Sequence, residues 1–240
     1  MRTRSHSSRQ RGLSIIEFMV GVAIGLLIVG GATKLMVDNL ASNRVLLLET
    51  RVNQDLRAAA DIIARDLRRA GYWESATSGV WGTGATSVTA NSYSAWGAAS
   101  TTSTSTSVNY AYARDTNNAV DNNEKVGFQL ATVSGVGVLQ IQDGLDSGWQ
   151  SLTDPTTVDI TGFSVTMTPQ SRDLSSYCNC LKTLTCTLTS IAATGNAPTL
   201  WIRQYEFQLD GKSVVNDSIK RTIKETVRVR NDQLTGTCPA

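Results

Sequence analysis

The chain has 240 residues, with 22 lysines and arginines against 20 aspartates and glutamates. The four arginines of residues 1–12 carry the basic excess, because 18 basic residues remain after residue 12, against 20 acidic ones. The balance therefore does not indicate nucleic-acid binding. The single histidine is His6, so residues 13–240 have none. This excludes Ser-His-Asp and Cys-His catalysis and His-based metal sites from that part. It has no glycine-rich nucleotide-binding motif either, so we expect no enzymatic activity, no cofactor and no metal.

Residues 13–33 form an apolar segment of membrane length in which Glu17 is the only charge. A helix of this length spans about 31 Å, the thickness of a bilayer core. The arginines before it predict a cytoplasmic N-terminus. A secretory signal peptide is the first alternative, but the apolar run is long for one and lacks an A-x-A cleavage pattern. A plain single-span anchor is the second, and it leaves Glu17 unexplained. A carboxylate in such a segment costs about 2.5–3.5 kcal/mol, so Glu17 is a candidate functional residue.

The run Arg11-Gly-Leu-Ser-Ile-Ile-Glu17 resembles the processing site of type IV prepilins and pseudopilins. The resemblance implies that prepilin peptidase cuts between Gly12 and Leu13 and methylates the new amine. It also implies that Glu17 neutralises the N-terminal amine of a neighbouring subunit during assembly. Most family members begin their mature chain with Phe, whereas this one would begin with Leu13.

The helical pattern continues over residues 34–71 as an amphipathic half with one apolar stripe, which includes Val52, Leu56, Ile63 and Leu67. Gly71 is the predicted stop. Four glycines in the apolar half are candidate packing or unwinding positions. Gly21 and Gly25 would let helices approach closely, and Gly30 and Gly31 would weaken the helix in an assembled filament.

The end of this helix, Asp61–Trp73, is similar to that of PilW-type minor pilins, in which an R-D-L-R-x-A-G-Y run closes the helix. The closing stretch Thr226–Asn231 resembles the last strand of the same proteins. The J-type pseudopilins of type II secretion have a related helix end and remain the alternative.

Residues 72–240 are predicted to be a periplasmic, β-rich globular domain. We expect residues 74–124 to be a long connection with one or two short strands, because their aromatic residues need burial. Runs of β-forming residues predict strands at Val126–Val133, Val136–Gln142, Thr157–Thr168, a strand ended by Asp210-Gly211, and Ile219–Arg230. Short turns between them imply an antiparallel sheet. The fold class is α+β: a pilin-like long helix packed on an antiparallel sheet.

Two charged stretches have a simple solvent-exposed interpretation beside a functional one. The first is oxygen-rich and could hold Ca²⁺, but it departs from the EF-hand pattern: Asp115, Asn117, Asn118, Asp121, Asn122, Asn123 and Glu124. The second is a basic strand that could touch DNA or a partner pilin, although a solvated face is the more usual explanation: Lys220, Arg221, Lys224, Arg228 and Arg230.

The four cysteines are Cys178, Cys180, Cys186 and Cys238. Outside the cytoplasm we expect two disulfides rather than a metal site, since no histidine accompanies them. The Cys178–Cys180 bridge is disfavoured by ring strain. Both remaining arrangements tie Cys238 to that pair.

These features together predict a PilW-like minor pilin that helps to initiate type IV pilus assembly and supports motility, adhesion or DNA uptake. Its expected partners are other minor and major pilins, prepilin peptidase and the inner-membrane assembly machinery. Its expected location is the bacterial inner membrane and then the pilus, near the tip. A J-type minor pseudopilin of type II secretion is the competing prediction.

Overall fold

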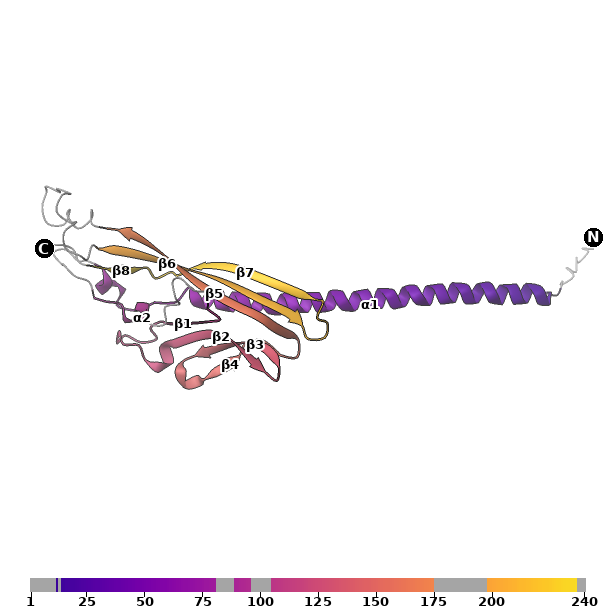
Figure 1. The fold of residues 1–240 in the computed structure, drawn as a ribbon, viewed down its shortest axis with the longest axis horizontal. Coiled ribbons are helices and arrows are strands. Elements are labelled where there is room, and N and C mark those ends of the chain that lie inside the picture. The colour runs from indigo at the N-terminus through magenta and orange to yellow at the C-terminus, as the bar shows by residue number, and fades with distance from the viewer. Residues whose placement is uncertain (1–11, 13, 81–88, 96–104, 175–197, 237–240) are drawn as a thin grey trace, which may run out of the picture. The chain divides into compact units, whose positions relative to one another are not determined.

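The computed structural model describes residues 12, 14–80, 89–95, 105–174 and 198–236 (Figure 1). Contacts between residues divide the chain into two compact units, Met1–Leu48 and Glu49–Ala240. The long helix α1, Ile15–Leu67, supplies most of the first unit and the first element of the second.

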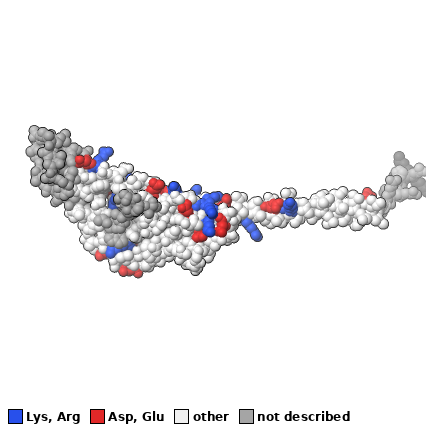
Figure 2. Space-filling model, viewed as in Figure 1, with Lys and Arg blue, Asp and Glu red and all other residues white. Residues whose placement is uncertain are grey.

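The first unit is a bare apolar helix. Every residue of α1 up to Leu47 is exposed, including large side chains such as Ile15, Phe18 and Leu27. Figure 2 shows this part of the helix as a mainly white surface with a few charged residues along it. By length and composition, α1 is the one helix of the described residues that could cross a membrane.

In the second unit the same helix has a single buried face. Its buried residues follow helical spacing: Val52, Leu56, Ala59, Ala60, Ile63, Ala64 and Leu67. The predicted stripe is therefore buried from Val52 onward, where it packs against β-structure, whereas residues 34–47 of the predicted amphipathic half are exposed.

In the described residues, eight strands form two sheets of four, and all of their pairings are antiparallel. The first sheet runs in the order β1 Ser107–Ala111, β2 Lys125–Val133, β3 Val136–Asp143 and β4 Trp149–Ser151. The second runs β5 Val158–Asp173, β6 Thr199–Ser213 and β7 Lys220–Arg228, with β8 Gln233–Thr235 also paired to β6. A long helix packed on antiparallel β-structure confirms the predicted α+β, pilin-like class.

Local chemistry explains two of the predicted features. The β2–β3 hairpin turns through Ser134 and Gly135 with φ of 52° and 85°, the conformation that a two-residue hairpin requires. In β5 the buried positions step by three between Ile160 and Phe163, and the register shifts there at Gly162. The three-residue step between the buried Ile160 and Phe163 is therefore a β-bulge.

Three predictions about the strands were wrong. Asp210-Gly211 does not end its strand, because β6 continues to Ser213. Gly211 lies inside it: a Cβ there would be 2.9 Å from Leu56 Cδ2, so glycine makes room for the helix. The β-structure forms two sheets, not one, and β4 and β8 are strands that the sequence did not predict.

The connection over residues 74–124 contains one strand, β1, in its described part. A 3₁₀ turn at Ala76–Gly79 and the short helix α2, Ser92–Ala95, precede it. Tyr93, Tyr110 and Tyr112 are buried, as the expected need to cover aromatic residues implies.

We expect Leu56→Ala to lower the free energy of unfolding by about 2–5 kcal/mol, because it opens a cavity where the helix meets the sheet. The matched control is Leu47→Ala in the same helix, where the side chain is 70% exposed and the expected change is within about 0.5 kcal/mol. Denaturant unfolding of the full chain in detergent, followed by tryptophan fluorescence, measures both. Equal losses would contradict the assignment of the buried face.

Candidate functional site

The structure places the predicted processing and pairing residues at the start of α1. Gly12 is exposed just before the helix, and Leu13 lies outside the described residues. Glu17 is exposed in the first turn. No basic side chain of the described residues lies within 4.0 Å of its carboxylate. A cation for Glu17 therefore has to come from outside the described part of the chain.

The four candidate glycines lie within α1 and present open surface. A Cβ at Gly21, Gly25, Gly30 or Gly31 would meet nothing within 4 Å. Gly30 and Gly31 are helical here. Their unwinding in a filament, and close packing at Gly21 and Gly25, remain predictions.

The other end of the helix is a junction of three chain segments. The helix leaves carbonyl groups unsatisfied at its C-terminus, and distant residues satisfy them. The Arg68 carbonyl accepts from the Arg230 N–H at 3.1 Å. The Asn231 amide donates to the carbonyls of Arg69 and Ala70, at 3.4 and 3.3 Å.

The loop segments complete this cap. Asn91 Nδ2 donates to the Gly71 carbonyl at 2.8 Å, and the Ala113 N–H donates to the Tyr72 carbonyl at 2.8 Å. Gly71 N–H donates to the Ala111 carbonyl at 2.8 Å. The helix end is thus held by residues from before β1, from just after it and from the C-terminal side of β7.

Gly71 is required at the junction for two reasons. Its φ of +70° is a left-handed conformation that side chains disfavour. A Cβ would also lie 2.5 Å from Arg203 Nη2. The helix α1 ends at Leu67, four residues before the predicted stop, and Gly71 lies in the turn that follows.

Arg203 is the buried charge of this region, with only 6% of its surface exposed. Its Nη1 donates to the Ser94 carbonyl at 2.9 Å and its Nη2 to the Asn231 carbonyl at 3.1 Å, while Nε is buried without a partner among the described residues. Burial lowers the pKa of the guanidinium. Sequence reasoning missed it, although an arginine between Trp201 and Tyr205 on the inward face of a strand was a visible signal.

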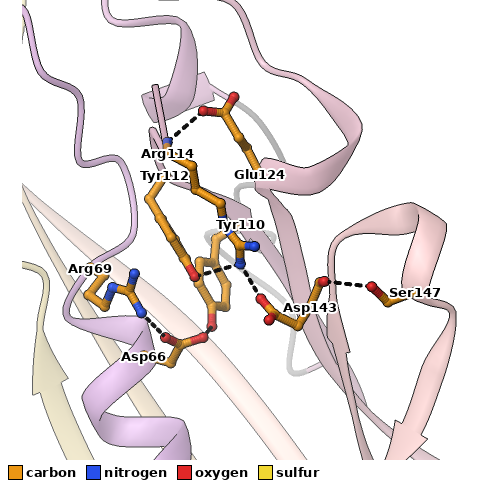
Figure 3. A network of polar contacts seen from close by, with 8 residues as sticks. All are labelled: Asp66, Arg69, Tyr110, Tyr112, Arg114, Glu124, Asp143 and Ser147. Atoms are coloured by element: carbon orange, nitrogen blue, oxygen red, sulfur yellow. Dashed lines mark hydrogen bonds and ion pairs between the residues drawn. The ribbon is translucent and has the colours of Figure 1, made fainter. Parts of the chain in front are cut away.

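A polar network joins the helix end to the first sheet (Figure 3). Asp66 accepts from the Tyr110 hydroxyl at 2.5 Å and pairs with Arg69 at 3.1 Å. The Arg69 guanidinium lies 4.0 Å from the centre of the Tyr112 ring, and that of Arg114 lies 5.2 Å from it. Burial, and then the Asp66 charge, raise the pKa of Tyr110, so this tyrosine stays protonated and keeps donating to Asp66.

Arg114 extends the network in Figure 3 to the far side of the first sheet. It donates to the Tyr112 hydroxyl at 2.9 Å and forms an ion pair with Asp143. The Asp143 carbonyl in turn accepts from the Ser147 hydroxyl at 3.0 Å. The motif at the end of the helix thus has a structural function: it orients α1 on the first sheet.

The oxygen-rich stretch brings the carboxylates of Asp115, Asp121 and Glu124 within 4.8 Å of one another. Glu124 is fully buried, and its oxygens accept from the Arg114 N–H at 2.6 Å, the Tyr93 hydroxyl at 3.1 Å and the Asp121 N–H at 3.0 Å. These donors satisfy Glu124 without a cation. The group is explained as a hydrogen-bonded turn that closes with a capping box.

Surface grooves flank the helix end. A groove of about 350 Å³ lies between the helix and the first sheet, lined by Arg65, Arg69, Tyr112 and Gln150 among others. A second, of about 530 Å³, is lined by Arg68 and residues 226–230. The predicted disulfide residues Cys178, Cys180, Cys186 and Cys238 lie outside the described residues.

A family model described as "Prepilin peptidase-dependent protein B" matches residues 45–229. This range takes in the buried part of the helix and strands β1 to β7, and it ends just before Arg230 and Asn231. No curated protein and no solved structure matches the chain.

We expect Gly71→Ala to cost about 2–4 kcal/mol of stability, from its left-handed backbone and the contact with Arg203. Gly135→Ala is the matched control, because its φ is +85° but nothing lies within 4 Å of its Cβ, so only the backbone cost of about 1–2 kcal/mol applies. Denaturant unfolding of the full chain measures the difference. Indistinguishable losses would show that the Arg203 contact is not restrictive.

Proposed function

The chain belongs to the prepilin peptidase-dependent protein B family, and from this membership we propose that it is a PilW-type minor pilin that takes part in initiating type IV pilus assembly. The observation that carries the proposal is the division of α1. Its buried face begins at Val52, whereas its residues up to Leu47 are exposed, and residues 18–33 among them carry no charge. Lipid covers that surface first, and neighbouring subunits cover it after assembly.

Membership in the family makes the chain a pilin-like protein that depends on prepilin peptidase. The proposed cleavage site of the peptidase lies between Gly12 and Leu13. It is supported by the exposure of Gly12 immediately before the helix, where a peptidase can reach it. The products are a basic 12-residue leader and a chain that begins at the apolar helix.

Glu17 then acquires a physical function. An isolated carboxylate is costly in a lipid-like environment, and a protonated amine nearby offsets part of that cost. The amine released at Leu13 of a neighbouring subunit is the proposed partner. Pairing of the two charges favours the register in which one helix is offset from the next.

The proposed topology follows from the same helix. The arginines of residues 1–12 keep the N-terminus in the cytoplasm, and the unit from Glu49 lies in the periplasm. The proposed partners are other minor and major pilins, prepilin peptidase and the assembly machinery of the inner membrane. In the assembled pilus the proposed position is near the tip, and the function is structural rather than enzymatic.

Processing provides the first test. We expect Gly12→Ala to remain uncleaved in cells that contain prepilin peptidase, and so to keep its 12 leader residues. Mass spectrometry of the purified chain measures this, with Gly21→Ala in the same helix as the control that should be cleaved. A wild-type chain that begins at any residue other than Leu13 would refute the proposed site.

Assembly provides the second test. We expect Glu17→Ala to be cleaved normally but to restore surface pili to a deletion strain at least about tenfold less well than wild type, from the loss of a charge pair in a low-dielectric setting. Pili, twitching and secreted protein are scored together. Undiminished piliation would oppose the pairing, and a deletion that abolishes only protein secretion would identify a J-type pseudopilin instead.

A further inference from the structure

β7 lies at one edge of the second sheet, and its outer side is open. It pairs with β6 on one side, and no described segment forms a backbone ladder with the other side. The hydrogen bonds at the two ends fix which residues face that edge. Ser213 N–H donates to the Ile219 carbonyl, and Val229 N–H donates to the Arg203 carbonyl.

In an antiparallel pair, residues alternate between those that bond to the partner strand and those that do not. Because Ile219 and Val229 bond to β6, the odd-numbered residues of β7 direct their backbone groups toward that strand. The even-numbered residues therefore direct their N–H and C=O groups toward the open edge: Lys220, Thr222, Lys224, Thr226 and Arg228. Of these groups, the Lys220 carbonyl accepts from Arg221 Nη1 at 2.9 Å.

The same five residues carry exposed side chains. Lys220, Lys224 and Arg228 recur at every fourth position, and opposite the last two on β6 lie the neutral Gln208 and Gln204. Arg228 pairs with Asp232 at 3.0 Å, whereas Lys224 has no ion pair within 4.0 Å among the described residues. The open edge is thus a basic one.

The odd-numbered residues fasten β7 to the helix. Arg221 pairs with Glu49 at 3.0 Å, Glu225 lies 3.9 Å from Arg68, and Val227 is buried. The edge is therefore a fixed template. Beside its end, the groove of about 530 Å³ lined by Arg68 and residues 226–230 gives space for a side chain of an added strand.

We propose that this edge, residues 220–228, binds an extended acidic segment of a neighbouring pilin-like subunit as an additional β-strand. The inference rests on the proposed function, because it takes that subunit as the source of the segment. The added strand pairs its backbone with the open groups from Thr222 to Arg228. Acidic residues at every fourth position of the segment lie opposite Lys220, Lys224 and Arg228.

The charge of this edge and its open backbone groups distinguish among the possible binding partners. A second copy of β7 would place lysine and arginine against lysine and arginine, which is unfavourable. A nucleic acid has no backbone N–H and C=O ladder to pair with the open groups. β7 also has no aromatic side chain for base stacking. An acidic peptide satisfies both the charges and the backbone.

The test is photo-crosslinking in cells from benzoylphenylalanine at position 226 of the full chain. We expect adducts whose crosslinked peptide, identified by mass spectrometry, is an acidic strand of another pilin-like protein. The same probe at position 166 lies on β5, the strand at the opposite edge of this sheet and two strands from β7, and should give few. Mapping the crosslinked peptide separates a specific pairing from mere capture.

Two sets of variants examine the mechanism. Lys224→Glu with Arg228→Glu should reduce the adduct about tenfold, whereas Arg172→Glu, also exposed, should not. Thr222→Pro removes an N–H that faces the open edge and should also reduce the adduct, whereas Thr222→Ala should not. Circular dichroism of each purified variant confirms that the fold is retained.

The outcomes are distinct. Adducts to nucleic acid, to a second copy of this chain or to a segment without acidic residues would overturn the proposal, as would no adduct from a chain that is cleaved and incorporated into pili. A chain that is neither cleaved nor incorporated would instead refute the proposed pilin function. Adducts that survive both the charge reversal and the proline would exclude strand addition.

Discussion

Burial of one face of α1 is the interaction on which the remainder of the structure depends. Leu56, Ile63 and Leu67 are fully buried, and they hold the helix on the sheets at a fixed rotation. That rotation brings Arg68 to Glu225 and Asp66 to Tyr110. The polar contacts therefore specify a geometry that apolar burial already stabilises, which is the usual division between these two kinds of interaction.

Two different environments act on one continuous helix. The part up to Leu47 has no cover, and the part from Val52 is covered on one face. A soluble protein rarely leaves so large an apolar surface exposed. The proposed pilin function accounts for the difference, since lipid and later other subunits serve as the missing cover. The basic edge of β7 adds a second, polar surface through which the same subunit can recognise a neighbour.

The sequence predicted the features that depend on local periodicity. The apolar stripe from Val52, the left-handed turn at Gly71 just after the helix and the β2–β3 hairpin each follow from spacing and from backbone preferences within a few residues. The division into two sheets did not follow, because alternation identifies strands but not which strands pair. Gly211 was wrongly predicted to end its strand for a related reason. Its small size makes room for Leu56, which is distant in the sequence, and nothing near Gly211 in the sequence reveals that contact.

The residues of the candidate site also differ in how far the sequence alone predicts them. Gly12 and Glu17 are recognisable from a short motif, while the cap at the helix end is built from residues far apart in the chain. Asn231 and Arg69, for example, are separated by 162 positions. Arg203 is intermediate, because a charge on an inward strand face is visible in the sequence but its carbonyl partners are not. Only the folded chain identifies Ser94 and Asn231 as those partners.

The hydrogen bonds at the helix end can form only after most of the chain has been synthesised. Arg230 and Asn231 are made about 160 residues after the carbonyls that they satisfy, so most of the chain must be made while the end of α1 still lacks these partners. Contacts so distant in sequence form late and slowly. Until then the apolar stripe from Val52 to Leu67 is uncovered and prone to association. The cover of this stripe therefore depends on strands that are synthesised long after the helix.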